Sequence, residues 1–190
     1  VEYLTQIGVN SELVDSRTII KTDDNFGYAR VNFKLSDKNI KAHFSKVKAT
    51  QIITGFIGST EKGETTTLGR EGSDFTAAII ANILNAESVS IWKDVPGVLS
   101  ADPKKMEGTV KIDSLSYREA VEMTHSGAQV IHPKTMKPLH NKAIPLYVKS
   151  FVSPDDSGTV IHEIDHKIKL PPIFIQKENQ VLRLIDLKKN

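Results

Sequence analysis

The segment "GREGSD", Gly69 to Asp74, carries three side chains that could bind a small ligand just ahead of an apolar run. Arg70 can hold a carboxylate through two parallel hydrogen bonds, and the N–H groups at the start of a helix also favour an anion. Asp74, four residues later, suits an ammonium group. Arg70 and Asp74 therefore predict a clamp for an amino acid, with Ser73 between them.

A purely structural explanation of the same residues stays open. Ser73 is a favourable N-cap for a helix predicted over residues 74–85, and Asp74 in the first turn would complement the helix dipole. Gly69 and Gly72 fit that explanation less well, because they indicate backbone freedom around the Arg70 guanidinium. On balance the chemistry favours the clamp.

A second candidate site is the segment "IWKDVPGVLSADPKK", residues 91–105. Asp94 closes a predicted strand, Pro96 and Gly97 fit the central positions of a type II turn, and Lys104 follows. These residue types suit a nucleotide-phosphate site, although an ordinary strand-to-loop junction with solvated lysines is the favoured alternative for this segment taken alone. The sequence contains neither G-x-x-x-x-G-K-[ST] nor G-x-G-x-x-G, so it predicts no phosphate loop of those types.

Composition excludes several other chemistries. The chain has no cysteine, which rules out thiolate nucleophiles, zinc–thiolate sites and disulfides and suits a reducing compartment, so we expect the cytoplasm. A formal net charge of +2 with interspersed basic residues predicts no nucleic-acid partner. No apolar run approaches the ~20 residues of a membrane span. His162 and His166 lie in a polar linker with no third ligand in view, so no metal site is predicted.

The elements that must hold these residues alternate between strand and helix. Strands are predicted over residues 11–16, 17–22, 28–33, 51–54, 88–94, 128–131 and 144–151, and helices over 36–45, 74–85 and 116–127, with further helices ending at Gly8 and starting at Pro133. Gly55 and Gly58, beyond the strand 51–54, should let the backbone approach another segment closely. Such alternation predicts an α/β fold with a mainly parallel sheet and helices on both faces.

A domain boundary is predicted where the composition becomes polar. Residues 1–162 form the first predicted domain, and residues 163–190 a linker and the start of a second one. The segment "IFIQKENQVLRLIDL" predicts two strands around the turn "KENQ", and an isolated hairpin is marginal in water. Because the chain also begins with valine, we expect a fragment of a longer protein.

Four blocks in one order, "GFIGSTEKGETTTLGREGSDFTAAIIA", "IWKDVPGVLSADPKK", "GAQVIHPKTMKPL" and "IPLYVKSF…GTVI", closely resemble the aspartokinases of the amino-acid kinase superfamily. The resemblance implies a three-layer α/β/α amino-acid kinase fold for residues 1–162 and the start of a regulatory, allosteric ACT domain after it. It implies ATP-dependent phosphorylation of the side-chain carboxylate of L-aspartate to 4-phospho-L-aspartate with Mg²⁺, the first step towards lysine, threonine and methionine. A homodimer of the full-length protein is also implied.

The resemblance also assigns residues. It implies aspartate binding by Arg70, Ser73 and Asp74, and nucleotide binding by Lys93, Asp94, Leu99, Lys104, Gln129 and Val130. The chain departs from the family at three of these positions: Gln129 stands where a lysine is usual, Lys93 where a threonine or serine is usual, and Leu99 where a tyrosine is common. The family's "K-F-G-G-T/S" segment is not matched, so the main catalytic lysine is expected upstream and the chain alone should be inactive.

Two other functions stay open. A degenerate kinase-fold domain could bind nucleotide or an amino acid for regulation without catalysis, and Gln129 is its best support. A sister kinase could act on another acidic amino acid.

Overall fold

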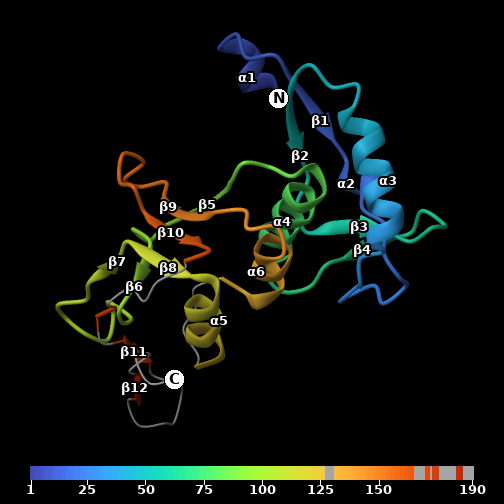
Figure 1. The fold of residues 1–190 in the computed structure, drawn as a ribbon. Helices are drawn as coiled ribbons and strands as arrows, with labels where there is room; N and C mark the ends of the chain where they lie inside the picture. The colour runs from blue at the N-terminus through green and yellow to red at the C-terminus, as the bar shows by residue number, and fades with distance from the viewer. Residues whose placement is uncertain (127–130, 165–169, 172, 176–182, 186–190) are drawn as a thin grey trace. The chain divides into compact units, whose positions relative to one another are not determined.

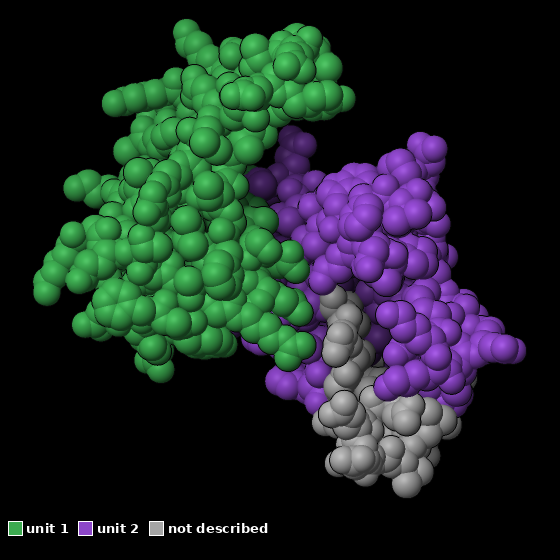
Figure 2. All heavy atoms as spheres, turned by 180° about the vertical axis from the view of Figure 1, so that it is seen from behind, with its two compact units in different colours: residues 1–85 green, residues 86–190 purple. Residues whose placement is uncertain are grey.

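In the computed structural model, strands and helices alternate along the chain (Figure 1). The structure describes residues 1–126, 131–164, 170–171, 173–175 and 183–185. The chain divides into two compact units, residues 1–85 and residues 86–190, which are coloured separately in Figure 2. Each unit is described by itself.

The first unit contains two small sheets and four helices among its described residues. Their order is α1 (Glu2–Gln6), β1 (Ser11–Val14), α2 (Ser16–Ile19), α3 (Phe33–Phe44), β2 (Thr50–Ile53), β3 (Ile57–Ser59), β4 (Thr65–Thr67) and α4 (Gly72–Leu84). Strands β1 and β2 pair in parallel, with Leu13 opposite Ile52, and β3 and β4 form an antiparallel hairpin. The carboxyl ends of β1 and β2 therefore lie at one edge.

The core of the first unit is apolar and includes one face of α4. Phe75, Ile79 and Ile83 recur at helical spacing and are all buried, as the sequence predicts. They pack with Ile40 of α3 and with Leu68, which precedes α4. This packing fixes the helix whose first turn carries the predicted clamp.

The second unit is built on a four-stranded sheet. Its elements are β5 (Val89–Lys93), β6 (Val98–Leu99), β7 (Lys111–Ile112), β8 (Ser114–Ser116), α5 (Tyr117–Ser126), α6 (Pro133–His140), β9 (Leu146–Ser150), β10 (Thr159–His162), β11 (Ile173–Ile175) and β12 (Arg183–Ile185). The sheet order is β5-β9-β10-β8, in which β5 with β9 and β10 with β8 are parallel pairs and β9 with β10 is antiparallel. The predicted α/β class and mainly parallel sheet are confirmed.

Alternation along the strands shows which face of this sheet is buried. Val89 and Ile91 of β5 and Leu146 and Val148 of β9 are buried, whereas Trp92 of β5 is exposed. Helix α5 packs against β8 and β10. Strands β11 and β12 form the antiparallel pair predicted around "KENQ", with Phe174 opposite Leu184.

Two local predictions in the first unit were wrong. Residues 17–22 do not form a strand, because the Asp15 side chain accepts the Arg17 N–H and caps the short helix α2. Residues 28–33 contribute only a bridge between Thr22 and Val31, since Asn32 caps α3 and the helix begins at Phe33.

Other expectations have mixed outcomes. Gly8, at φ 80°, follows α1, and Pro133 is the first residue of α6, as predicted. The strand predicted at residues 128–131 falls almost wholly outside the described residues. The domain boundary at residues 162–163 stays a prediction. None of the described helices combines the length and apolar character that a membrane crossing requires.

Candidate functional site

The turn that carries Arg70 is a tight left-handed one. Gly69 has φ 77°, and a Cβ on it would lie 2.2 Å from Cδ2 of Tyr28, so only glycine fits there. Glu71 also has positive φ, 53°, and its carbonyl accepts the Phe75 N–H at 3.1 Å. Two left-handed residues in three turn the chain sharply into α4.

The prediction that Ser73 is the N-cap was wrong. Helix α4 begins at Gly72, the N-cap is Glu71, and no side chain makes a capping hydrogen bond. The left-handed turn at Glu71 starts the helix before Ser73, which becomes its second residue and is exposed. With the capping role removed, the hydroxyl is left for the binding role that the resemblance implies.

Arg70 and Asp74 flank this helix start. Arg70 is exposed and makes no hydrogen bond or ion pair with any residue that the structure describes. Asp74 is half-buried in the first turn of α4. A guanidinium just before a helix and a carboxylate in its first turn are groups that suit the carboxylate and the ammonium group of one amino acid.

The loop after β2 lies against the same helix start. A Cβ on Gly55 would lie 3.0 Å from Cβ and 3.1 Å from Cα of Ser73, and one on Gly72 would lie 2.7 Å from Cδ2 of Phe56. The predicted close approach at Gly55 is therefore confirmed, and its neighbour is α4. The end of a strand and the start of a helix meet here, as they do at ligand sites of α/β proteins.

Phe56 is a strained residue that no sequence pattern singles out. Its φ is 76°, a value that costs a bulky residue about 1–3 kcal/mol. Its N–H donates to Oγ1 of Thr76 at 3.0 Å, and its carbonyl accepts the Leu68 N–H at 2.8 Å. These two bonds join the loop to α4 and to the segment before Arg70.

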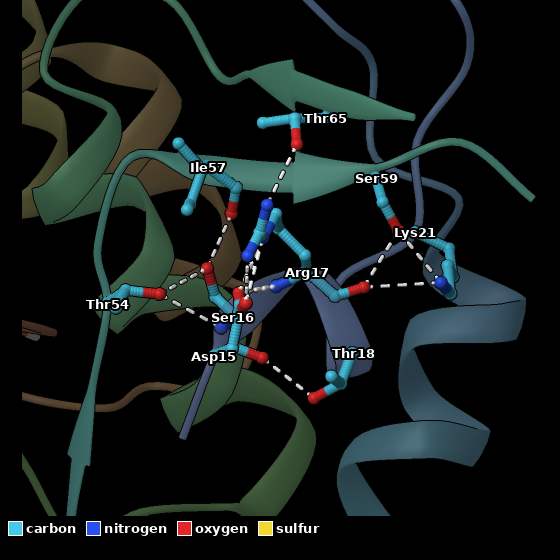
Figure 3. A network of polar contacts seen from close by, with 9 residues as sticks. All are labelled: Asp15, Ser16, Arg17, Thr18, Lys21, Thr54, Ile57, Ser59 and Thr65. Carbon is cyan, nitrogen blue, oxygen red and sulfur yellow. Dashed lines mark hydrogen bonds and ion pairs between the residues drawn. The ribbon is translucent and has the colours of Figure 1, made fainter. Parts of the chain in front are cut away.

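A polar network ties the ends of β1 and β2 together (Figure 3). Ser16 donates its N–H to Oγ1 of Thr54 at 2.9 Å, and its hydroxyl donates to the Ile57 carbonyl at 2.8 Å. These two hydrogen bonds attach both ends of the loop that bears Gly55, at Thr54 and Ile57, to the residue Ser16 that lies just beyond β1.

The same network reaches the "TTTLGR" segment through Arg17. Its guanidinium pairs with Asp15, which lowers the pKa of that carboxyl, and it also donates to Oγ1 of Thr65 at 3.1 Å. Nζ of Lys21 donates to Oγ of Ser59 at 2.8 Å. These side chains hold the β3–β4 hairpin that leads to Arg70 (Figure 3). These side chains were not predicted as functional residues, although the charged residues Asp15 and Arg17, just after the apolar end of β1, were a usable signal.

Lys93 and Asp94 lie at the carboxyl end of β5 in the second unit. Lys93 is half-buried and opposite Ser150 of β9, and its carbonyl accepts the Phe151 N–H at 3.0 Å. Asp94 follows and is exposed. The two residues therefore lie where parallel strands end, the usual place for a ligand.

Leu99 and Lys104 lie on one hairpin, residues 98–112, formed by β6, β7 and the loop between them. Leu99 pairs with Lys111. In the loop, the Asp102 carboxylate accepts the Lys104 N–H at 2.9 Å. Lys104 is exposed near the tip of hairpin 98–112.

Gly97, at the start of this hairpin, has the positive φ that the sequence predicts, but its value of 141° is far from the roughly 80° of a type II turn. The predicted turn type is therefore wrong, and close packing of Gly97 against Thr159 is the physical reason.

Gln129 and Val130, the other predicted nucleotide residues, lie outside the described residues. Of the histidines, His162 hydrogen-bonds to Oγ of Ser114 at 2.9 Å. Among the residues that the structure describes, no group of three or more His, Asp or Glu side chains could hold a metal ion.

A family model for the amino acid kinase family matches residues 1–150. The chain belongs to the amino acid kinase family. Within it, the chain is 39% identical over 176 residues to "Lysine-sensitive aspartokinase 3" of Escherichia coli, a match that covers 92% of this chain and 38% of that protein. It is 46% identical over 127 residues to the chloroplastic "Bifunctional aspartokinase/homoserine dehydrogenase 1" of Zea mays, covering 66% of this chain and 14% of that protein.

Solved structures confirm the predicted amino-acid kinase fold. Escherichia coli aspartokinase III in complex with aspartate and ADP matches with a TM-score of 0.81 and 38% identity over 92% of this chain and 39% of that one. The UMP kinase of Ureaplasma parvum, 17% identical, matches with a TM-score of 0.57 and shares the fold alone. The resemblance to aspartokinases is confirmed, and the chain spans about 38% of the length of the Escherichia coli relative.

Proposed function

We propose that the protein to which this chain belongs transfers the γ-phosphoryl group of ATP to the side-chain carboxylate of L-aspartate. The observation that carries the proposal is the start of α4, where Arg70 and Asp74 flank a helix terminus approached closely by the loop after β2. The aspartokinase names of its relatives support the same substrate.

Each residue has a proposed task. Arg70 binds the α-carboxylate of aspartate bidentately, Asp74 accepts hydrogen bonds from its ammonium group, and Ser73 donates a hydroxyl hydrogen bond at the helix start. The substrate is then held with its side-chain carboxylate free. An oxygen of that carboxylate forms a bond to the γ-phosphorus, the bond from phosphorus to the β–γ bridging oxygen breaks, and ADP leaves with the electron pair.

Nucleotide binding is proposed for the second unit. Lys93, Asp94, Leu99 and Lys104 lie at the end of β5 and on hairpin 98–112, and Gln129 and Val130 complete the proposed set. Phosphoryl transfer depends on positioning and on cations that neutralise phosphate charge. Mg²⁺, bound mainly through the ATP phosphates and one or two carboxylates, would supply part of that charge, and Asp94 fits as an exposed carboxylate there. A lysine of a "K-F-G-G-T/S" segment in the full-length protein is proposed as the main catalytic cation.

The wider role follows from the proposed reaction. We propose that 4-phospho-L-aspartate feeds lysine, threonine and methionine synthesis, that an ACT domain begins after residue 163, and that the full-length protein is a homodimer. The cysteine-free sequence supports a reducing compartment, the cytoplasm, and the nearly balanced charge supports a protein without nucleic-acid or membrane partners.

The deciding experiment traps the acyl phosphate of the full-length protein with hydroxylamine. ATP and Mg²⁺ are supplied with L-aspartate, L-glutamate or N-acetyl-L-glutamate in parallel. Hydroxamate should form with aspartate alone, and the 190-residue chain by itself should form none. Hydroxamate formed only with glutamate or N-acetylglutamate would refute the aspartokinase proposal in favour of a sister kinase for another acidic amino acid. No hydroxamate with any of the three acids would favour a non-catalytic regulatory domain.

A further inference from the structure

Thr159, the first residue of β10, is fully buried beside the start of hairpin 98–112. Its hydroxyl accepts the Val98 N–H at 2.8 Å and donates to the Ile112 carbonyl at 2.6 Å. Val98 and Ile112 are directly opposite each other in the β6–β7 ladder. One hydroxyl therefore satisfies a backbone donor on one strand of the hairpin, β6, and a backbone acceptor on the other strand, β7.

The backbone around Thr159 is shaped for this contact. Gly158 has φ 73°, and a Cβ on it would lie 2.1 Å from the Val148 carbonyl oxygen. A Cβ on Gly97 would lie 2.5 Å from Oγ1 of Thr159. Only glycine fits at these two positions, and together they let β10 approach the start of the hairpin closely.

Asp156 makes a second link to the same hairpin. Its carboxylate accepts the Gly158 N–H at 2.9 Å and hydrogen-bonds to Nζ of Lys111. Lys111 is the ladder partner of Leu99. Thr159 thus contacts the pair Val98–Ile112, and Asp156 contacts the neighbouring pair Leu99–Lys111 through Lys111.

We propose that Asp156 and Thr159 form a clasp that positions hairpin 98–112, and with it Leu99 and Lys104, for nucleotide binding. Both are positioning residues, since they act through the hairpin. The proposal rests on the proposed function, which assigns Leu99 and Lys104 to the nucleotide. A hydroxyl is needed because it can donate and accept at once, which valine of the same shape cannot do.

The test compares Thr159→Val with Thr159→Ser. Without nucleotide, hydrogen exchange of the Val98 amide in the chain should be about tenfold faster in Thr159→Val, because its buried N–H loses its acceptor. In the full-length protein, the same variant should bind ADP about tenfold more weakly and raise the KM for ATP with the KM for aspartate unchanged. Thr159→Ser should resemble the wild type in all three measurements.

Asp156→Asn provides a milder variant, with Asp113→Asn as its matched control. Asp113 lies 3.8 Å from Nζ of Lys111 and is strongly exposed, so its loss should leave ADP affinity unchanged. Asp156→Asn should weaken ADP binding about threefold. Equal ADP affinity in both variants would overturn this half of the clasp.

Three outcomes are distinguishable for Thr159. Unchanged Val98 exchange in Thr159→Val overturns the clasp, and equal increases in both KM values overturn the positioning role. A wild-type protein that binds no ADP refutes the proposed nucleotide site. In that case faster exchange at Val98 still supports the clasp as a link between β10 and the hairpin.

Discussion

Gly55→Ala tests whether the close approach between the loop after β2 and α4 sets the aspartate site. The added Cβ would lie 3.0 Å from Cβ and 3.1 Å from Cα of Ser73. One of these atoms belongs to the backbone, so relief requires the helix start to move by a few tenths of an ångström. That helix start carries Asp74, and Arg70 lies two residues before its first residue, Gly72.

The expected loss of stability is modest. Overpacking typically costs about 1–3 kcal/mol, and the lower unfolded-chain entropy of alanine returns about 0.4–1 kcal/mol. We expect a net loss of about 1 kcal/mol, or a Tm lower by about 2–4 °C for a chain of this length. The KM for aspartate in the full-length protein should rise about fivefold, since the two charged side chains move relative to the substrate, whereas the KM for ATP should not change.

Gly27→Ala is the matched control for this substitution. A Cβ on Gly27 has nothing within 4 Å, and its backbone is not in the left-handed region. Alanine there should leave both KM values unchanged and keep or slightly raise the Tm. Calorimetry of the chain and steady-state kinetics of the full-length protein measure both effects. If Gly55→Ala gives the same KM values and Tm as Gly27→Ala, the loop after β2 does not position the proposed aspartate site.

Three further substitutions test the other assignments. Asp74→Ala should raise the KM for aspartate at least tenfold and leave that for ATP nearly unchanged, because it removes the ammonium partner; equal effects in steady-state kinetics would refute the clamp. Asp94→Ala should show the reverse pattern, and normal ATP affinity by calorimetry would refute the nucleotide assignment. The Lys111 ammonium, hydrogen-bonded to Asp156, lowers the pKa of that carboxyl below its unfolded value of about 3.9. The ionised Asp156 carboxyl therefore contributes fully to stability above about pH 4, and this contribution is lost as the pH falls further. Chemical denaturation should show that the free energies of unfolding of the wild type and of Asp156→Asn converge below that pH.

The apolar pattern predicted much of the fold. The buried faces of α4 and of β5 follow directly from spacings of 3.6 and 2 residues, and both elements are present. The prediction failed over residues 17–33, where Asp15 and Asn32 cap helices with their side chains. Such caps override a strand-favouring composition because they satisfy N–H groups that a strand would pair elsewhere.

The sequence predicts a binding site at the start of α4, and that prediction stays untested, but no sequence pattern indicated how the helix start is built. Glycine is the usual sequence signal for a left-handed residue, and it correctly marked Gly69. Glu71 and Phe56 adopt the same conformation without any such signal. The contacts that stabilise Phe56 come from Thr76 and Leu68, and their proximity depends on tertiary structure.

These details change the interpretation of the serine in "GREGSD". As an N-cap, Ser73 would have been needed for helix stability, and its functional role would have been secondary. With Glu71 at the N-cap and no side-chain capping bond, the helix start is held by packing against the loop after β2. Because the backbone of that loop is strained at Phe56, the surrounding structure must hold it in place. The crowding of Arg70, Ser73 and Asp74 therefore fits the aspartate site that we propose better than it fits a helix cap.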